Sequence, residues 1–213
     1  MSFKVILLIS VCLFLSSSLR SEDTLRSKNR SGVYTSNFGK VTIAITGASI
    51  TGAYEYYDKW DEKNHSFTDI NCFYIHGKIS KKGVWQIVAC YPGYDLKIPG
   101  KLIISDDDRS LRMVLTRSPD GGYLATDFTD EKNNQNTFLL RERLNISELK
   151  VVVSKKANLF DYNGITFAQR KGYLIRQDFV GVIATRGSYT KISYSSPGTE
   201  KRSEYWVEGR DLN

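Results

Sequence analysis

The sequence predicts an all-β protein. Short runs of β-branched and aromatic residues alternate with polar residues along most of the chain, as in Val41–Ile45. Gly, Asn, Asp and Ser interrupt these runs at close intervals, a pattern typical of strands joined by tight turns. The chain of 213 residues is long enough for one large or two small domains. We therefore expect an N-terminal antiparallel β-barrel or sandwich, followed by a second, smaller β-barrel.

The N-terminus has the order of segments found in a secretory signal peptide. Lys4 precedes an apolar run from Val5 to Leu15, and the small residues Ser16 to Ser18 follow it. The run is too short for a membrane anchor, because a bilayer-spanning helix needs about 20 apolar residues. We predict that residues 1–21 are a signal peptide. The protein is then exported, either periplasmic or secreted, and its mature chain has no integral membrane segment.

The first β domain is predicted to occupy residues 32–145. Clean alternation predicts neighbouring strands at 41–45 and 48–57, with Gly47 in the turn between them. A polar loop is expected at 58–69, and turns are expected at the Pro-Gly pairs 92–93 and 99–100. About nine strands with hairpin-length connections favour an antiparallel meander. The remaining strands are expected at 70–79, 84–91, 101–105, 111–116, 123–126 and 137–141.

This first domain is loosely similar to small lipocalin-like barrels. A Gly-x-Tyr entry, Gly32 to Tyr34, precedes an up-and-down series of strands. A barrel of this size either encloses a ligand cavity or is filled by its own side chains. We expect a filled barrel.

Cys72 and Cys90 are the two cysteines that remain once the predicted leader is removed. They lie on strands joined by a short turn, so pairing centred on Lys81 sets them opposite each other, and a neighbouring register sets them diagonally. Opposed residues on antiparallel strands have Cα atoms about 4.5–5.5 Å apart, within the range of a disulfide. We predict a disulfide between Cys72 and Cys90. The alternative, a reactive thiol, requires an activating base nearby.

The C-terminal third carries most of the functional information in the sequence. Its motifs are Asn158-Leu159, Gly172-Tyr173-Leu174, Asp178 to Ile183, Gly187 to Tyr194, Tyr205-Trp206-Val207 and Asp211-Leu212. Their order and spacing resemble the bacterial SH3-like (SH3b) domain. The resemblance implies a small SH3-like β-barrel at residues 148–213, a bacterial source and a ligand-binding role. Tyr189 stands where that family usually has Trp, and Tyr205 stands where it usually has Gly.

The same resemblance implies a binding groove lined by aromatic side chains. The residues that it assigns to the groove are Tyr173, Tyr189, Tyr194 and Trp206. The polar segment 161–171 contains the turn dipeptide Asn163-Gly164, and we expect it to form a hairpin beside this groove.

A second aromatic segment, Tyr54 to Trp60, lies in the first domain. Tyr and Trp dominate the contact surfaces of proteins, but alternate members of a strand also pack into a core. If Tyr54 and Tyr56 face inward, then Tyr57 and Trp60 remain as candidates for contact with a ligand.

The net charge of +7 is unevenly distributed. From residue 150 to the C-terminus there are 11 Lys and Arg against 6 Asp and Glu, whereas residues 22–149 hold 17 of each. A basic exported domain suits an anionic wall polymer, an acidic protein or an anionic lipid; a generally basic surface that aids solubility is the alternative. Nucleic acid is not expected as a partner, because the basic residues form neither an aromatic RNA-binding motif nor a basic helix face.

Residues with catalytic or metal-binding chemistry form no recognisable motif. His65 and His76 are not spaced as metal ligands, and a serine-hydrolase elbow is missing. The triplet Asp106–Asp108 lacks the Gly and the distal Glu of a calcium loop and is expected to be an exposed turn. The alternative is a pair of carboxylates of the kind that cleaves sugar polymers. Its members would come from the acidic cluster Glu55, Asp58, Asp61 and Glu62. We predict no metal, no cofactor and no enzymatic activity.

The sequence therefore predicts an exported, non-enzymatic protein whose SH3-like module binds peptidoglycan or an envelope protein. One alternative is a periplasmic inhibitor or immunity protein that blocks a wall-lytic enzyme or a toxin, since a rigid β scaffold lowers the ordering cost of binding. The other alternative is a lipocalin-like carrier of a small ligand.

Overall fold

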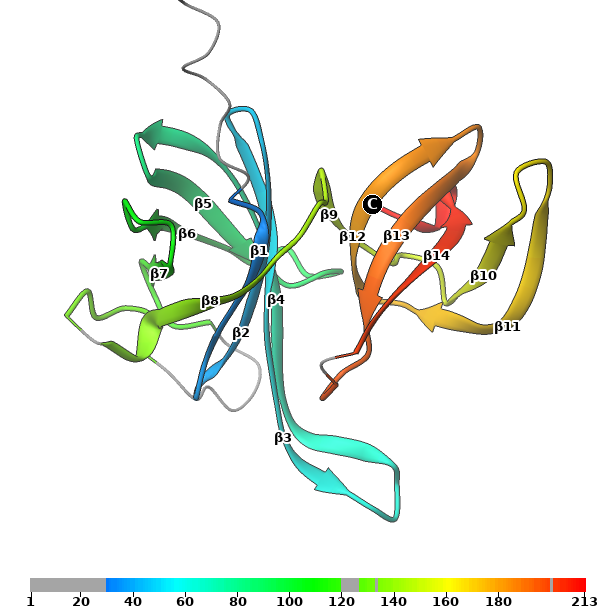
Figure 1. Ribbon diagram of the computed structural model, residues 1–213. Coiled ribbons are helices and arrows are strands. Elements are labelled where there is room, and N and C mark those ends of the chain that lie inside the picture. Colours follow the sequence, from blue (N-terminus) through cyan, green and yellow to red (C-terminus); the bar gives the residue numbers. More distant parts are fainter. Residues whose placement is uncertain (1–29, 120–126, 133, 200) are drawn as a thin grey trace, which may run out of the picture.

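The computed structural model describes residues 30–119, 127–132, 134–199 and 201–213. Over these ranges the protein is all-β, as predicted, and it consists of a closed eight-stranded antiparallel barrel and a second, six-stranded antiparallel sheet (Figure 1). The predicted signal peptide and the predicted strand at 123–126 lie outside the described residues. In the described ranges, no helix has both the length and the apolar character needed to cross a bilayer.

The barrel strands follow one another in chain order, and β8 pairs with β1 to close the barrel. A short 3-10 helix, η1 (Asn134–Asn136), precedes the last strand. The strands are β1 (Gly32–Ser36), β2 (Gly39–Thr46), β3 (Ser49–Asp61), β4 (Ser66–Lys81), β5 (Val84–Cys90), β6 (Lys97–Ile104), β7 (Ser110–Leu115) and β8 (Thr137–Arg143).

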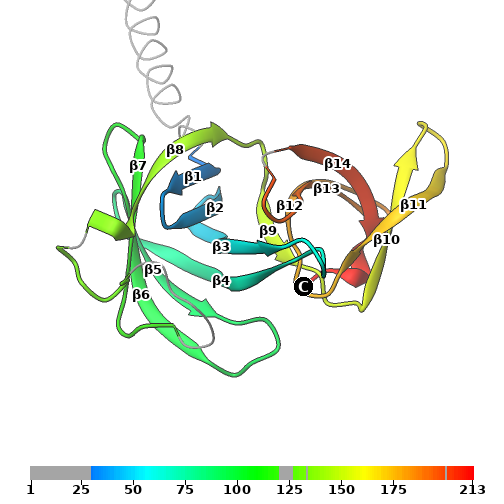
Figure 2. The same ribbon diagram turned by 90° about the horizontal axis from the view of Figure 1, so that it is seen from below.

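The second sheet has the strand order β11-β10-β14-β13-β12-β9, and Figure 2 shows that its strands curl. Its core contains Val180, Ile192 and Val207. The 3-10 helix η2 (Gly209–Asp211) follows its last strand, and an isolated bridge then joins Leu212 to Val152. The strands are β9 (Glu148–Val151), β10 (Lys156–Tyr162), β11 (Phe167–Ile175), β12 (Phe179–Arg186), β13 (Tyr189–Ser195) and β14 (Arg202–Glu208).

Large apolar side chains fill the interior of the barrel, as expected. Alternate residues of each strand point inward, and Tyr54 lies at the centre of the resulting core. Its ring stacks on Phe73 with a centroid distance of 4.9 Å and meets Phe128 edge-on at 5.1 Å. Its hydroxyl donates a hydrogen bond of 2.6 Å to the carbonyl oxygen of Phe38. The buried tyrosine therefore has a partner for its one polar group.

One predicted loop and one predicted turn in the barrel are wrong, because the structure places most of their residues in strands. Residues 58–69 are not a polar loop, because β3 and β4 continue beyond the barrel as a long hairpin arm that ends between Asp61 and Ser66 (Figure 1). Cross-strand pairing of Trp60 with Phe67 and an ion pair of 2.6 Å between Lys59 and Asp69 stabilise the arm.

The Pro99-Gly100 pair is not a turn but lies inside β6. A Cβ atom at Gly100 would lie 2.4 Å from the carbonyl oxygen of Val114 on β7, so only glycine fits there. Gly100 therefore permits a close approach of two strands, which explains a glycine within a strand.

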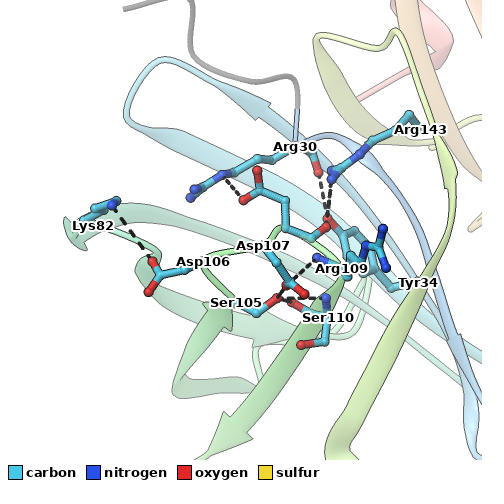
Figure 3. A network of polar contacts seen from close by, with 10 residues as sticks. Arg30, Tyr34, Lys82, Ser105, Asp106, Asp107, Arg109, Ser110 and Arg143 are labelled. Carbon is cyan, nitrogen blue, oxygen red and sulfur yellow. Dashed lines mark hydrogen bonds and ion pairs between the residues drawn. The ribbon is translucent and has the colours of Figure 1, made fainter. Parts of the chain in front are cut away.

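The acidic triplet Asp106–Asp108 forms the turn between β6 and β7 and is only partly exposed, contrary to expectation. Asp108 is 2% exposed and pairs with Arg30 at 2.7 Å. Arg143 donates hydrogen bonds to the Tyr34 hydroxyl and to the Asp108 carbonyl oxygen, at 3.2 and 2.7 Å (Figure 3). These contacts tie the start of the described chain to the end of the barrel.

Asp107 has a separate local role in the same turn (Figure 3). Its carboxylate accepts hydrogen bonds from the Ser105 hydroxyl at 2.5 Å and from the Arg109 backbone N–H at 3.0 Å. These bonds favour the charged form, so the pKa of Asp107 lies below its usual value. Two members of the triplet, Asp107 and Asp108, therefore stabilise the turn and its contact with Arg30.

A third hydrophobic core joins the second sheet to the outside of the barrel. It contains Ala44 and Ala53 of the barrel, Leu149 of β9 and, packed against them, Tyr74 and Phe179. The Tyr74 hydroxyl donates to the Leu149 carbonyl oxygen at 3.0 Å, and the Leu149 N–H donates to the Thr51 hydroxyl at 2.7 Å. The two units therefore pack together through apolar contact and directed hydrogen bonds.

We expect Tyr54→Phe to lower the free energy of unfolding by about 1 kcal/mol, because it removes the hydrogen bond to the Phe38 carbonyl and leaves the ring packing intact. Chemical denaturation monitored by fluorescence measures this change. Tyr94→Phe, at a side chain that is 71% exposed, is the matched control and should be neutral. Equal stabilities for both variants would contradict the assigned role of the Tyr54 hydroxyl.

Candidate functional site

The four residues that the sequence assigned to one groove lie in two separate places. Tyr189 and Trp206 belong to an aromatic cluster on β10, β11, β13 and β14. Tyr173 and Tyr194 line a different cleft, between β11 and the turn that joins β13 to β14. The predicted single groove, lined by all four side chains, is therefore not formed.

The aromatic cluster consists of five rings, all at least partly buried: Phe160, Tyr162, Phe167, Tyr189 and Trp206. Phe167 is its centre, because it stacks on Tyr189 at 3.9 Å with an angle of 15° between the rings and meets Trp206 edge-on at 5.2 Å. The guanidinium group of Arg186 lies 4.9 Å from the centre of the Tyr162 ring. Such a surface combines flat apolar faces with a cation.

Strand pairing explains how the cluster forms. Phe160 pairs with Trp206 across β10 and β14, and the hairpin turn after β10 sets Tyr162 opposite Phe167. Of these five residues, the sequence motifs predicted only Tyr189 and Trp206. The alternation of Phe160 and Tyr162 ahead of the Asn163-Gly164 turn is a signal that could have identified those two residues.

The cleft that contains Tyr173 and Tyr194 is small, with a volume of about 250 Å³. Tyr173 is 52% exposed, and the Lys156 ammonium lies 4.2 Å from the centre of its ring. The Tyr194 hydroxyl donates a hydrogen bond of 3.4 Å to Asp178. Burial raises the pKa of both Tyr194 and Asp178.

Tyr57 faces the space between the two units. It contributes to a groove of about 620 Å³ that runs between the outside of the barrel and the β13–β14 turn. Ion pairs occupy the polar walls of this groove: Lys40 with Glu55 at 3.0 Å and Arg202 with Glu142 at 3.6 Å. The lining charges thus compensate one another.

Glu55 is the one buried member of the acidic cluster considered in the sequence. It is 8% exposed, and it accepts a hydrogen bond of 3.4 Å from the Tyr57 hydroxyl in addition to its ion pair with Lys40. Burial, followed by the neighbouring Glu55 charge, raises the pKa of Tyr57. Asp61 instead lies at the end of the arm, where it accepts hydrogen bonds from Asn64. The structure therefore does not bring Glu55 and Asp61 together as a pair.

Trp60 lies on the hairpin arm and is 47% exposed. It packs edge-on against Phe67 at 5.0 Å, and Phe67 in turn contacts the β13–β14 turn at Gly198. Tyr54 and Tyr56 both pack against the barrel core. Of the two contact candidates, Tyr57 is thus largely covered and Trp60 is accessible.

Cys72 and Cys90 are both free thiols in the structure. Cys90 pairs with Tyr74, so Cys72 lies two residues away from the opposed position. Diagonal neighbours of this kind lie about 7–8 Å apart, and a disulfide does not span more than about 7 Å between Cα atoms without backbone movement. The predicted disulfide is therefore not formed at this register.

Among the described residues, no group of three or more His, Cys, Asp or Glu side chains is arranged to hold a metal ion. His76 lies on β4 beside Tyr74, with ring centroids 6.2 Å apart, whereas His65 lies at the end of the arm beside Trp60. The two histidines are thus in different parts of the molecule.

In comparisons with known proteins, no family model matches the chain, and neither a curated protein nor a solved structure matches it significantly. The resemblance to the SH3b domain therefore depends on the sequence motifs alone.

We expect the contribution of Asp178 to the stability of the protein to decrease as the pH rises above about 4. Its folded-state pKa is raised above the usual 3.8, so the folded state holds the proton more tightly than the unfolded state does. The stabilisation is fully present below pH 3.8 and is lost as the pH rises through the raised pKa. Asp178→Asn should flatten this part of the pH profile, measured by denaturation between pH 4 and 7. Asp95→Asn, at a fully exposed side chain, should leave the profile unchanged; identical profiles for both variants would refute the assignment.

We expect both Cys72 and Cys90 to react as free thiols once the protein is unfolded, because the pairing of β4 with β5 keeps them apart in the native protein. In the native protein, alkylation at pH 8 should be slow, since burial raises the pKa of Cys72 to about 11 and also raises that of Cys90. Mass spectrometry after alkylation measures both results. A native mass that is two hydrogens lower, with no alkylation after unfolding, would instead establish the disulfide.

Proposed function

We propose that this is an exported binding protein without enzymatic activity, and that its second sheet attaches it to peptidoglycan or to a protein of the bacterial envelope. The observation that carries the proposal is the aromatic cluster around Phe167, in which flat rings from four strands share one partly exposed surface. Rings held in this way bind with little loss of conformational freedom, because their neighbours already fix them.

Three further observations support this proposal. The sequence motifs of the C-terminal third resemble the SH3b domain, which implies a binding role. The predicted leader implies export. The positive charge is concentrated after residue 150, which suits an anionic wall polymer.

A binding role is also favoured over catalysis by the state of the acidic groups. Glu55 is neutralised by Lys40, and Asp108 is neutralised by Arg30. Both buried carboxylates thus have structural partners, Glu55 in the wall of the groove between the two units and Asp108 in the turn between β6 and β7. The carrier alternative requires an internal cavity, whereas the described barrel interior is filled around Tyr54 and Phe73.

The hairpin arm supports a second candidate function, which is inhibition of a wall-lytic enzyme or a toxin. The arm projects from the barrel (Figure 1), and it presents Trp60, which is 47% exposed. An exposed Trp on a projecting hairpin suits insertion into the cleft of another protein. In this case Trp60, and not Trp206, is the residue on which binding depends.

We expect the purified protein to sediment with insoluble peptidoglycan, and Trp206→Ala to abolish most of this sedimentation. Loss of one central aromatic residue typically costs about 2 kcal/mol or more of binding free energy, which corresponds to about a thirtyfold weaker affinity. Tyr189→Ala, as a second variant in the cluster, should have a similar effect, whereas Tyr94→Ala should have none.

Thermal unfolding of each variant distinguishes lost binding from lost folding. Sedimentation that Trp206→Ala and Tyr189→Ala leave unchanged would exclude the aromatic cluster as the binding surface. If no form sediments with peptidoglycan, capture of a partner from an envelope extract, compared between Trp206→Ala and Trp60→Ala, decides between the cluster and the arm.

A further inference from the structure

A second binding site is indicated by the cleft between β11 and the β13–β14 turn, which we call the basic cleft. It lies apart from the aromatic cluster, since neither Tyr189 nor Trp206 lines it. Its volume is about 250 Å³, slightly below the roughly 300 Å³ at which sites for small molecules begin. The side chains that matter here are Arg170, Lys171, Tyr173, Tyr194, Lys201 and Tyr205.

The charge of the basic cleft has one sign. Arg170, Lys171 and Lys201 line it, and the described lining contains no carboxylate. Arg170 also forms an ion pair of 3.2 Å with Asp161, outside the lining, so its charge is partly compensated. Lys171 and Lys201 are both exposed. The cleft is therefore suited to an anionic group.

The aromatic part of the cleft consists of three tyrosines. Tyr205 packs against the core of the second sheet, and the guanidinium group of Arg170 lies 4.8 Å from the centre of its ring. Tyr173 is half exposed, so part of its surface is free for contact. Tyr194 is held by its hydrogen bond to Asp178. Rings fixed in this way, next to cations, suit a flat or cyclic ligand that carries negative charge.

The backbone of β11 contributes to the form of the cleft. Gly172 has a φ of +101°, a conformation that L side chains rarely adopt. Gly172 lies between Lys171 and Tyr173, and all three residues line the cleft. The pairing of β10 with β11 also shifts register between Asn158 and Phe160, close to the same point.

We propose that the basic cleft binds an acidic glycan, meaning a carbohydrate whose rings carry carboxylate groups. A sugar ring lies against a tyrosine face, and its carboxylate is held by Lys171 and Lys201. Serine hydroxyls at Ser196 and Ser203 also line the cleft and are suited to sugar hydroxyls. A sugar is favoured over an acidic peptide because the lining adds serine hydroxyls and three tyrosine rings to the cations, and these groups pair with sugar hydroxyls and pack against sugar rings.

The experiment is calorimetric titration of the purified protein with an oligogalacturonate, in which every sugar ring carries a carboxylate. A neutral maltodextrin of the same length is the comparison ligand, and polyglutamate is the acidic peptide. The titrations are carried out at about 0.15 M salt, at which charges more than about 8 Å apart in solvent are largely screened. We expect binding of the oligogalacturonate and none of the maltodextrin.

The double variant Lys171→Gln with Lys201→Gln should weaken oligogalacturonate binding by about tenfold or more. The matched control is Lys81→Gln with Lys155→Gln, which removes the same charge from exposed lysines outside the cleft and should change the affinity less than about twofold. Trp206→Ala should bind the oligogalacturonate as the wild type does, so failure of the aromatic cluster proposal and failure of this one are distinguishable.

Three results would overturn the proposal. An equal loss of affinity in both double variants would mean that binding follows net charge and not the cleft. Tighter binding of polyglutamate, lost in the Lys171 and Lys201 variant, would assign the cleft to an acidic protein. An oligogalacturonate that does not bind to the wild type would exclude the site. Unfolding temperatures within a few degrees of the wild type establish that the variants are folded.

Discussion

The packing of β9 and β12 against the outside of the barrel is the contact on which the arrangement of this protein depends. The outer face of a barrel strand normally meets water, but here the small side chains of Ala44 and Ala53 allow Leu149 and Phe179 to approach closely. Gly181 continues the same contact, because a Cβ atom there would lie 2.8 Å from the Ile146 side chain. Large side chains therefore do not fit at Ala44, Ala53 and Gly181 in this interface.

Several polar features follow from this contact. Glu55 lies on the outer face of β3 and becomes buried as the second sheet covers it, which explains its pairing with Lys40. Asp178 comes from the second unit, and its charge acts on Tyr57 of the first. Groups from distant parts of the chain thus share one partly buried region, in which burial raises the pKa values of both Tyr57 and Asp178.

The sequence predicted those features that depend on local alternation. Strands with a clean pattern, such as 41–45 and 48–57, formed as expected, and Tyr54 lies in the core of the barrel. The hairpin arm was missed because Asp58, Lys59 and Asp69 read as loop residues, although cross-strand pairs keep them in strands. The sequence motifs predicted one groove where the structure has two surfaces, the aromatic cluster and the basic cleft. Pairing between strands that are distant in the sequence determines which tyrosines lie together, and the motifs do not show this pairing. The same dependence on register determines the separation of Cys72 and Cys90.

Strand β11 is the outermost strand of the second sheet on the side away from the barrel, whereas β9 is bridged on its outer side by the C-terminal residues. An uncovered outer strand invites pairing with another chain, and lysine and arginine are among the residues that prevent it. Arg170 and Lys171 lie on this strand, and Gly172 interrupts its regular backbone with a positive φ. The cations that line the basic cleft therefore also oppose edge-to-edge pairing between copies of the protein.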